Sequence, residues 1–319
     1  MRVAFAAGLL FATLVPGAPA QNYPSKPIRL VVPFPAGGGV DTTGRVIGQK
    51  LSEYLGQPVV IENRPGAAGT IGVDNVAKSP ADGYNLVVTG PGSITVAPVL
   101  YAKVPFDPER DLAPVANLVM MPFILVAHPA VPARNPKELL ALAKARPGQL
   151  NVASGGTGTA THLVLEMFNI LGHVNMVHVS YKGTAPALVD LLGGHADLFF
   201  SDPAAVPLVR AGKLKVIGVT SLKRYPALPE APTIDESAIK GFDATNWYPL
   251  LAPAGTPKEI VARLTAEVKR ALSDPAVKDK LSGQGLDPAF LPPEELAQLI
   301  RTDLEKWGKV VKTMGIRLE

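Results

Sequence analysis

The sequence predicts an α/β fold with mostly parallel sheets. Short apolar segments rich in β-branched residues alternate with segments of helical period along most of the chain. Two glycine-rich turns, at 34–41 and 154–159, each connect a predicted strand to a predicted helix. No flexible linker separates the two halves that contain these turns. We therefore expect two α/β lobes, with the chain passing between them more than once.

The first twenty residues have the pattern of a secretory signal peptide. Arg2 supplies a positive charge, an apolar run follows at 3–15, and small residues at 18–20 offer a cleavage site before Gln21. The apolar run is too short to span a bilayer, and no later segment reaches about 18 uninterrupted apolar residues. We expect residues 1–20 to be removed, leaving a soluble protein in the periplasm if the source is Gram-negative. The remaining chain of roughly 300 residues is long enough for two domains.

The first half of the mature chain alternates strands and helices. Its first helix is well marked, because Asp41 can act as the N-cap and Gly56 can end it. Apolar residues recur at helical spacing between these two positions. The predicted elements are a strand at 28–32, a helix at 41–55, a strand at 59–62, a helix at 69–78 and a strand at 86–89.

A second α/β series is expected from Phe123 onward. Its helices are predicted at 136–145, 160–171 and 184–192, and its strands at 150–153, 176–179, 197–200 and 214–220. After it come a proline-rich loop at 222–232, a long strand at 243–251 and two helices at 257–272 and 292–314. The last helix carries an apolar stripe that we expect to pack in the core: Leu296, Ile300, Leu304, Trp307, Val311 and Met314.

The two terminal helices have no strand of their own to cover. Together with the missing linker, they predict a chain that crosses between two lobes twice and returns to the first. The crossing points are expected near 121–123 and near 247–249. Lobe 1 would then contain residues 21–122 and 249–319, and lobe 2 residues 123–248.

Composition excludes several functional classes. The chain has no cysteine, which excludes thiolate catalysis, disulfides and cysteine-ligated metals. Its net charge of +4 comes from dispersed Lys and Arg, so no basic stripe for nucleic acid is expected. Among the five histidines, His162 lies four residues before Glu166 and the two could share a metal, although a helix-surface or cap interaction is the more ordinary interpretation. We expect no metal and no cofactor.

Nucleotide and hydrolase motifs are incomplete. Residues 90–94 resemble a nucleophile elbow but lack its second glycine. Residues 156–161 keep the G-x-G of a dinucleotide fingerprint, yet Thr161 stands where its last small residue belongs, and no acidic residue ends the next strand. The chain has no G-K-[ST] sequence for a P-loop. An enzyme is therefore not expected.

The two glycine-rich turns are candidates for anion binding. Such a turn leaves backbone N–H groups unpaired at a helix N-terminus, where the helix dipole is positive. Hydroxyl groups of Thr42, Ser154 and Thr159 could donate to the same anion, directly or through water. Two such turns in separate halves suggest two jaws around one ligand. Alternatively, the glycines only make tight strand-to-helix connections.

An ordered set of motifs covers nearly the whole mature chain: 23–38, 60–69, 81–84, 180–183, 190–194, 211–214, 247–248 and 251–257. In this order they resemble the Bug family, the solute receptors of tripartite tricarboxylate transporters. The resemblance implies a monomeric, two-lobed periplasmic binding protein of type II, the Venus-flytrap kind, that closes on a small mono- or dicarboxylate, including aromatic acids and acidic amino acids. It would deliver this solute to one large and one small integral membrane subunit. A sensor that presents its closed form to a signalling partner is the alternative.

The resemblance also implies which positions line the pocket. The first turn contributes Phe34, Ala36, Gly37, Gly38, Asp41 and Thr42, and the loop after the third strand contributes Gly92, Ser93 and Ile94. The second turn contributes Ser154, Gly158 and Thr159, with His162 at the helix start. Asp202 and Trp247, together with Ile94, are expected to face the middle of the ligand.

This chain departs from the family pattern at two positions. It has Ser201-Asp202 where relatives place Asp or a small residue at the first position, so Asp202 is shifted by one residue. Pro249 stands where relatives usually carry glycine, and a proline removes one hydrogen-bond donor from the strand that returns to lobe 1.

Overall fold

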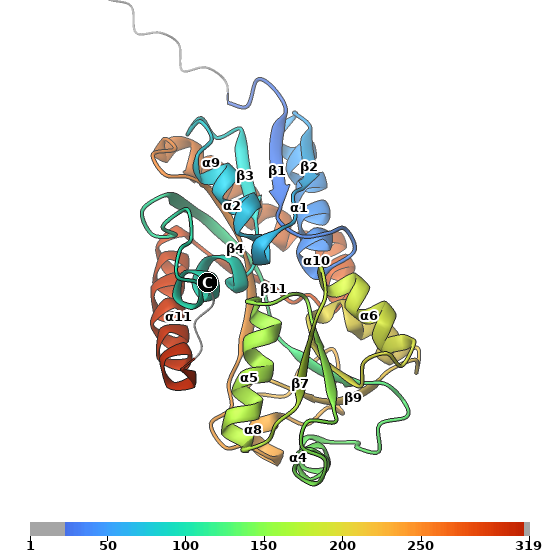
Figure 1. Cartoon of the computed structure of the whole chain (residues 1–319). Helices are drawn as coiled ribbons and strands as arrows, with labels where there is room; N and C mark the ends of the chain where they lie inside the picture. The colour runs from blue at the N-terminus through green and yellow to red at the C-terminus, as the bar shows by residue number, and fades with distance from the viewer. Residues whose placement is uncertain (1–22, 316–319) are drawn as a thin grey trace, which may run out of the picture.

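The computed structural model describes residues 23–315, so the predicted signal peptide lies outside the described residues. Two sheets form two lobes, one above the other in Figure 1, with helices packed around each. The first sheet has six strands. They are, in spatial order, β11 (Pro288–Leu291), β4 (Leu112–Pro122), β10 (Thr245–Pro253), β3 (Asn85–Val88), β1 (Ile28–Val32) and β2 (Val59–Asn63).

The second sheet has five strands. They are, in spatial order, β7 (Val177–Ser180), β6 (Asn151–Ser154), β8 (Leu198–Ser201), β5 (Ile124–Ala127) and β9 (Lys215–Val219). Its helices are α4 (Pro136–Ala145), α5 (Ala160–Gly172), α6 (Thr184–Leu192), α7 (Val206–Arg210) and α8 (Ile234–Ser237), with a short 3-10 turn η3 (Pro203–Ala205).

The helices that accompany the first sheet come from both ends of the chain. They are α1 (Gly39–Leu55), the 3-10 turn η1 (Ala67–Gly69), α2 (Thr70–Ala77), the π-helical segment η2 (Gly92–Val96), α3 (Ala97–Leu100), α9 (Lys258–Ser273), α10 (Pro275–Ser282) and α11 (Pro293–Met314). Among the described residues, no helix combines the length and apolar character that a membrane crossing requires.

The sheets are mixed, which corrects the expectation of mostly parallel sheets. β1 pairs in parallel with β2 and β3, and β6 pairs in parallel with β7 and β8, whereas the remaining pairings are antiparallel. The reason is the double crossing. β4 carries the chain toward the second sheet and β10 brings it back beside β4, so these two strands run in opposite directions.

The change of sheet occurs at two places. Outgoing, β4 ends at Pro122 and β5 begins at Ile124; returning, β9 ends at Val219 and β10 begins at Thr245. Residues 245–248, which the predicted division assigns to lobe 2, pair with β4 in the first sheet. The exact division of the chain into lobes stays a prediction.

Several elements differ from the sequence-based expectations. Strand β4 was not predicted, because its two prolines and its mostly apolar sequence, interrupted only by Asn117, give neither strand alternation nor helical period. Strand β5 and the short elements η2, α3, η3, α7, α8, α10 and β11 were also not predicted. Pro249 coincides with a shift in register between β10 and β4 that lies between Tyr248 and Pro249, which is where a missing donor is tolerated.

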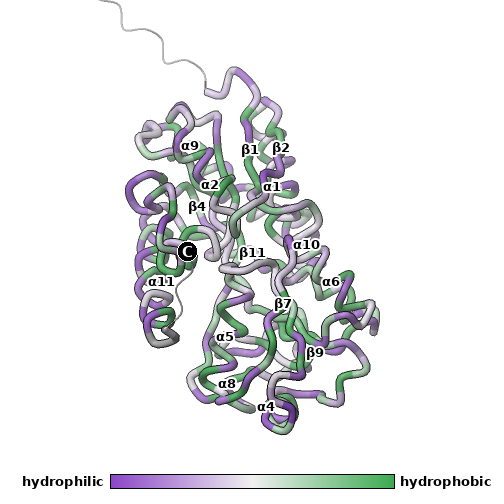
Figure 2. Tube along the Cα trace, in the orientation of Figure 1, coloured by the Kyte–Doolittle hydropathy of each residue, from purple (hydrophilic) through white to green (hydrophobic). Residues whose placement is uncertain are grey.

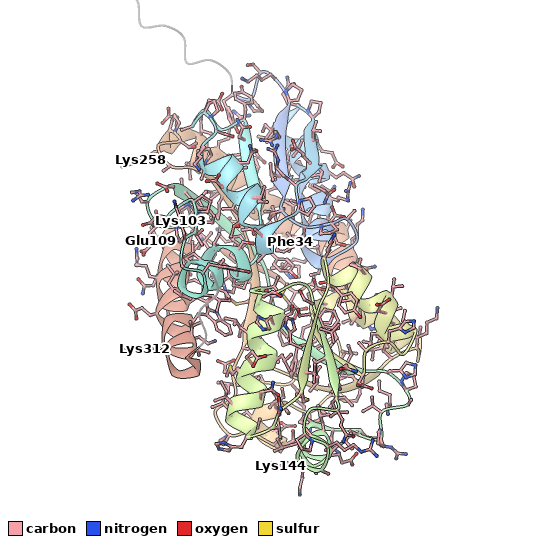
Figure 3. The ribbon with its side chains drawn as sticks, in the orientation of Figure 1. Phe34, Lys103, Glu109, Lys144, Lys258 and Lys312 are labelled. Carbon is pink, nitrogen blue, oxygen red and sulfur yellow. The ribbon has the colours of Figure 1, made fainter. Side chains whose placement is uncertain are left out.

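The cores lie where the sheets meet their helices. Figure 2 shows hydrophobic residues along the central strands, while the outer helix α11 alternates hydrophobic and hydrophilic residues. Of its predicted stripe, Leu296, Ile300, Trp307 and Val311 are buried and Leu304 is half-buried, while the side chain of Met314 is outside the described set. Labelled charged side chains such as Lys144 and Lys258 point outward, whereas Phe34 lies where the lobes meet (Figure 3).

Candidate ligand-binding cleft

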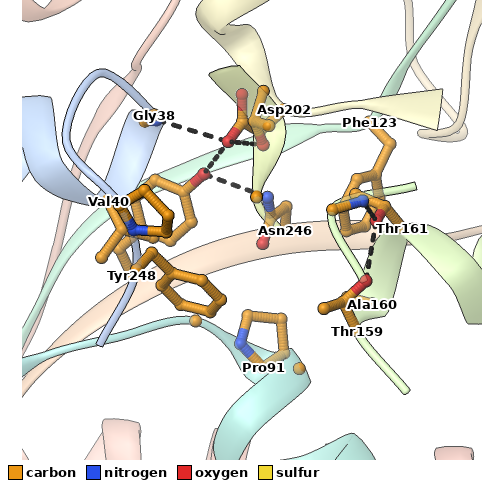
Figure 4. Close-up of a pocket in the computed structure, with 18 residues that line it drawn as sticks. Gly38, Val40, Pro91, Phe123, Thr159, Ala160, Thr161, Asp202, Asn246 and Tyr248 are labelled. Carbon is orange, nitrogen blue, oxygen red and sulfur yellow. Dashed lines mark hydrogen bonds between the residues drawn. The ribbon is translucent and has the colours of Figure 1, made fainter. Parts of the chain in front are cut away.

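A cavity of about 60 Å³ lies between the two lobes. The first residues of three helices line it, namely Gly39 of α1, Ala160 of α5 and Thr184 of α6. No Lys, Arg or His side chain is among the described residues that line it. Its lining, shown in Figure 4, is Phe34, Pro35, Gly38, Gly39, Val40, Gly90, Pro91, Gly92, Phe123, Gly155, Thr159, Ala160, Thr161, Gly183, Thr184, Asp202, Asn246 and Tyr248.

The N-terminus of α1 offers unpaired amides to this cavity. Gly38 precedes the helix in extended conformation and has no side chain with which to cap it. Within residues 23–315, the amides of Gly38 and Val40 have no hydrogen-bond partner. Both residues line the cavity, so a positive helix end with free N–H groups faces it.

Asp41 is not the N-cap that the sequence predicted, because the helix begins two residues earlier. Its carboxylate accepts hydrogen bonds from the amide of Gly37 (3.0 Å), from Nε of Arg45 (2.9 Å) and from Nδ2 of Asn63 (2.8 Å). Burial opposes its ionisation, but these hydrogen bonds outweigh burial and lower the pKa of Asp41. The Gly37 amide is therefore used inside the turn and is not free for an anion.

The second glycine-rich turn is also largely closed on itself, contrary to the expectation of unpaired amides. Gly155 donates to Oγ1 of Thr161 (2.9 Å), and Gly158 donates to Nδ1 of His162 (3.2 Å). The unpaired amides are those of the first two residues of α5, Ala160 and Thr161, for which the described residues provide no acceptor. The anion-binding feature of this lobe is thus the first turn of α5.

Two histidines, His162, which is buried, and His178, which is half-buried, support the second turn. The rings of His162 and His178 stack with their centroids 3.9 Å apart. Oγ of Ser154 accepts from the Gly156 amide (3.1 Å) and is hydrogen-bonded to Nε2 of His178 (2.6 Å). Burial, together with His178, lowers the pKa of His162 to about 4. Burial also lowers the pKa of His178, so both rings are neutral near pH 7.

His162 and Glu166 form a pair on one helix face, with Nε2 and Oε1 3.7 Å apart. Burial raises the pKa of Glu166. Within residues 23–315, no group of three His, Asp or Glu side chains gathers where it could hold a metal ion. This pair is an intrahelical interaction that orients the imidazole of His162. The other ring nitrogen, Nδ1, accepts the hydrogen bond from the Gly158 amide.

The loop that leads into η2 forms a third wall. Gly92 stands so close to α5 that a Cβ atom there would lie 2.9 Å from the Ala160 amide nitrogen, which is why glycine is needed. The long helix α11 holds the segment in place. Oγ1 of Thr95 donates to Oδ2 of Asp303 (2.6 Å), and this oxygen also accepts from Nε1 of Trp307 (3.1 Å).

Asp202 is the only charged side chain in the lining described here. It is 6% exposed. Its Oδ2 accepts from the Gly39 amide (3.3 Å), Oγ1 of Thr184 (3.0 Å) and Oη of Tyr248 (3.5 Å), as Figure 4 shows. Its Oδ1 accepts from the Ala204 amide (3.1 Å). Burial raises the pKa of Asp202, and the hydrogen bonds oppose this shift.

Five of the residues predicted for the site line the cavity: Phe34, Gly38, Gly92, Thr159 and Asp202. The one-residue shift at Ser201 has therefore not removed Asp202 from the cleft. Ten others lie outside the lining: Ala36, Gly37, Asp41, Thr42, Ser93, Ile94, Ser154, Gly158, His162 and Trp247. Ile94 and Trp247 are buried in a hydrophobic cluster of the first lobe. A direct contact between any of these residues and a ligand stays a prediction.

The α6 side of the cleft was not predicted from the sequence. Gly183 and Thr184 follow strand β7 and open α6, so they repeat the strand–turn–helix arrangement of the two predicted turns. That pattern could have identified them. No local pattern indicates Phe123 or Asn246, which reach the cavity through the two chain crossings, whereas Tyr248 belongs to the 247–248 motif, in which Trp247 was predicted for the pocket instead.

A wider outer cleft of about 560 Å³ adjoins the cavity and shares Phe34, Pro35, Gly155 and Gly183 with it. The lobes touch across this cleft. Oη of Tyr101, next to α3, donates to the carbonyl of Thr157 in the second turn (2.8 Å).

Comparison with known proteins gives a consistent result. The model of the tripartite tricarboxylate transporter family receptor matches residues 43–316. The UPF0065 protein of the tcbD–tcbE intergenic region of Pseudomonas sp. strain P51 is 39% identical over 310 residues, which covers 96% of this chain and 92% of that protein. Protein BugT of Bordetella pertussis is 35% identical over 98% of this chain and 97% of its own length.

Solved structures of related binding proteins also match the fold of this chain. An adipate-bound protein of R. palustris matches with a TM-score of 0.90 at 35% identity, covering 93% of this chain and all of that one. The periplasmic binding protein BugD matches with a TM-score of 0.87 at 35% identity, with the same coverage. MatC from Rhodopseudomonas palustris with bound malate matches with a TM-score of 0.85 at 35% identity over 91% of this chain and all of MatC.

Proposed function

Because the chain belongs to the family of tripartite tricarboxylate transporter receptors, we propose that it binds a small carboxylated solute between its lobes and delivers it to a transporter in the membrane. One observation carries the ligand class. The free amides at the N-termini of α1 and α5 face one cavity whose described lining has no cationic side chain. A carboxylate satisfies such amides without a basic residue.

The free energy available from these amides is sufficient. A hydrogen bond to a charged group contributes roughly 1.5–3 kcal/mol. A micromolar complex needs about 8 kcal/mol. Gly38, Val40, Ala160 and Thr161 together reach this range before the costs of ordering the ligand are subtracted. The hydroxyl groups of Thr159 and Thr161 do not add to it, because Oγ1 of Thr159 donates to the Gly156 carbonyl (2.7 Å) and lies 2.8 Å from Oγ1 of Thr161.

The proposed ligand is a mono- or dicarboxylate, including aromatic acids and acidic amino acids. Adipate and malate in two related structures support a carboxylate at this site. The signal peptide predicted at 1–20 and the related periplasmic binding protein BugD support a periplasmic location. The proposed partners are the large and small integral membrane subunits of the transporter. The protein is proposed to release its ligand chemically unchanged.

A ligand panel tests this function. The mature chain from Gln21 is unfolded and refolded to remove any retained solute, then heated with aliphatic, aromatic and amino-acid carboxylates. A ligand that binds the folded state raises the melting temperature, and calorimetry then gives its affinity. We expect at least one carboxylate to bind with micromolar affinity or better and to be recovered intact. No response to any carboxylate would refute the proposal.

A further inference from the structure

The wall that Pro91 and Gly92 form beside the cavity sets the space at one of the unpaired amides. Both residues line the cavity. The Gly92 backbone packs on the first turn of α5, where a Cβ atom on Gly92 would lie 2.9 Å from the Ala160 nitrogen. The Ala160 amide is one of those that the proposed function assigns to the ligand carboxylate. A small shift of this wall therefore closes or widens the approach of a carboxylate to that amide.

The segment that carries this wall cannot fix its own position. Gly92–Val96 forms a single π-helical turn, and the helix α3 that follows it has four residues. A π-helical turn is an uncommon conformation that recurs at functional sites, and helices this short are not stable by themselves. All residues of the turn are buried. Contacts with the rest of the protein must therefore determine where Pro91 and Gly92 lie.

Asp303 of α11 makes such a contact. Its Oδ2 accepts a hydrogen bond from Oγ1 of Thr95 (2.6 Å) and another from Nε1 of Trp307 (3.1 Å). The same Thr95 oxygen lies 3.0 Å from the carbonyl oxygen of Pro91. The Thr95 hydroxyl thus lies between the Asp303 carboxylate and a residue that lines the cavity.

A carboxylate is not the side chain that the pattern of α11 predicts at this position. Asp303 is 6% exposed and lies three residues after Ile300 and four before Trp307, both of which are buried. Burial raises the pKa of Asp303, and the hydrogen bond from Thr95 and the charge of Lys306 oppose this shift. An apolar residue would pack here at lower cost, because a buried carboxylate loses its hydration. The hydrogen bond that the carboxylate makes explains its position better than packing does.

Helix α11 also contacts both sides of the gap between the wall and α5. Trp307 packs in a hydrophobic cluster that contains Val96 of the π-helical turn and Leu163 of α5. Figure 1 shows α11 reaching from the first lobe down beside α5. One helix thus contacts the segment that carries Gly92 and the helix that carries Ala160, so their separation depends on it.

We propose that Asp303 is a positioning residue of the ligand site. Through Thr95 it holds Pro91 and Gly92 at the distance from Ala160 at which a ligand carboxylate reaches the amide. This inference rests on the proposed function, because it assumes that the Ala160 amide donates to the ligand. Asp303 lies outside the described lining of the cavity and acts without touching the ligand.

Removing the hydroxyl that links the two elements tests the proposal. In Thr95→Val, the affinity for the tightest-binding carboxylate of the panel should fall about tenfold or more, as calorimetry measures it. Hydrogen exchange of the backbone amides at 92–100 should also become faster, because the turn has lost its link to α11. Thr95→Ser keeps the hydroxyl and should recover most of the affinity that Thr95→Val loses.

Two variants of the carboxylate extend the test to the other partner. Asp303→Leu continues the apolar stripe of α11 and removes the acceptor, so it should lose as much affinity as Thr95→Val. Because both changes break one link, the double variant should lose no more than either single variant. Asp303→Asn keeps an oxygen that can accept from Thr95 and should lose less. It also covers the case in which Asp303→Leu does not fold.

Thr265→Val is the matched control. Oγ1 of Thr265 in α9 is hydrogen-bonded to the carbonyl of Val115 in β4 (2.8 Å), so this hydroxyl also links a helix to a neighbouring element. Like Thr95, it has a second contact with the carbonyl four residues earlier, here that of Val261. Thr265 lies outside the described lining of the cavity. This variant should lose stability without losing affinity.

The outcomes distinguish this inference from the proposed function. If no carboxylate binds to the wild type, the proposed function fails. If the wild type binds a carboxylate and the folded Thr95→Val and Asp303 variants bind it equally well, the proposed function stands and the positioning role is wrong. The role is also wrong if Thr265→Val loses as much affinity as Thr95→Val. A loss in Thr95→Val that Thr95→Ser recovers, with none in Thr265→Val, supports the role.

Discussion

At the scale of single residues, the cleft is organised by side chains that do not line it. Asp41 ties the first turn to Arg45 and Asn63, and the pair of His162 and His178 holds the second turn through Gly158 and Ser154. These groups consume turn amides that would otherwise bind a ligand. The amides that stay unpaired lie at the N-termini of α1 and α5, where the helix dipole strengthens their attraction for an anion.

Acidification should weaken the fold through His162. Its pKa is about 4 in the folded state and 6.5 in an ordinary environment, so the unfolded chain binds more protons between these values. The stability contributed by the neutral ring is present above pH 6.5 and is lost as the pH falls toward 4, by about 3 kcal/mol at most. Urea unfolding at pH 7 and pH 4.5 should show a smaller loss in His162→Asn, whose amide oxygen can still accept from Gly158.

His173→Asn is the matched control for this measurement. His173 lies at the end of α5 in the left-handed region, which asparagine tolerates, and it is exposed. This variant removes a histidine without touching the stacked pair, so its pH dependence should equal that of the wild type. If His162→Asn also follows the wild type, the neutral ring does not contribute the stability described above.

At the scale of elements, the free N-terminus of α1 is the feature most directly open to test. Val40 is the second residue of the helix, a position at which proline fits the backbone and lacks the N–H group, although the Val40 side chain is buried in the core. Val40→Pro should therefore weaken carboxylate binding about tenfold, the loss of one charge-assisted hydrogen bond, and should also lower stability because a core side chain changes shape. Isothermal titration calorimetry with the best ligand of the panel measures this change.

Lys137→Pro provides the control, because Lys137 is the second residue of α4, outside the described lining of the cavity. Its affinity for the ligand should match that of the wild type. Equal affinities in both proline variants would show that the Val40 amide does not bind the carboxylate.

The elements also show what the sequence can and cannot predict. Helices α4 and α6 were predicted with their exact bounds, because caps, prolines and apolar spacing agree there. The glycine-rich turns were located correctly, but the use of their amides was not, since side chains such as His162 reach them only in three dimensions. Strand β4 has no local signal, and its pairing with β10 joins residues far apart in the sequence.

At the scale of the whole molecule, the lobes touch each other through small residues. Gly158 packs against Tyr101 of the other lobe, where a Cβ atom would lie 2.3 Å from the phenol oxygen. Gly183 packs against Pro35, where a Cβ atom would lie 3.0 Å from Cδ. Because closure of the two lobes depends on these contacts, one added carbon atom at the interface should lower ligand affinity even though it does not contact the ligand.

Gly158→Ala should reduce ligand affinity about tenfold or more, because the new methyl group opposes the approach of Tyr101. Part of its cost is backbone strain, since Gly158 has φ of 79°. Gly148→Ala is the matched control: its φ is 72°, and a Cβ there meets only Asn175 at 3.9 Å. That variant should lose stability without losing affinity.

A double-mutant cycle with Tyr101→Ala completes this test. If the methyl group acts through the phenol, removing the phenol should restore much of the affinity that Gly158→Ala loses. Equal losses of affinity in Gly158→Ala and Gly148→Ala would instead assign the whole effect to backbone strain.

The pairing of β4 with β10 has a mechanical consequence. The two strands stay bonded to each other up to Pro122 and Thr245, the last residues before the chain leaves the first sheet. Because the two connecting segments are paired side by side, they cannot bend independently, and the lobes can rotate only about one shared axis. We expect the lobes to open and close along a single path. The proposed transporter subunits would then meet only two forms of this protein, open or closed.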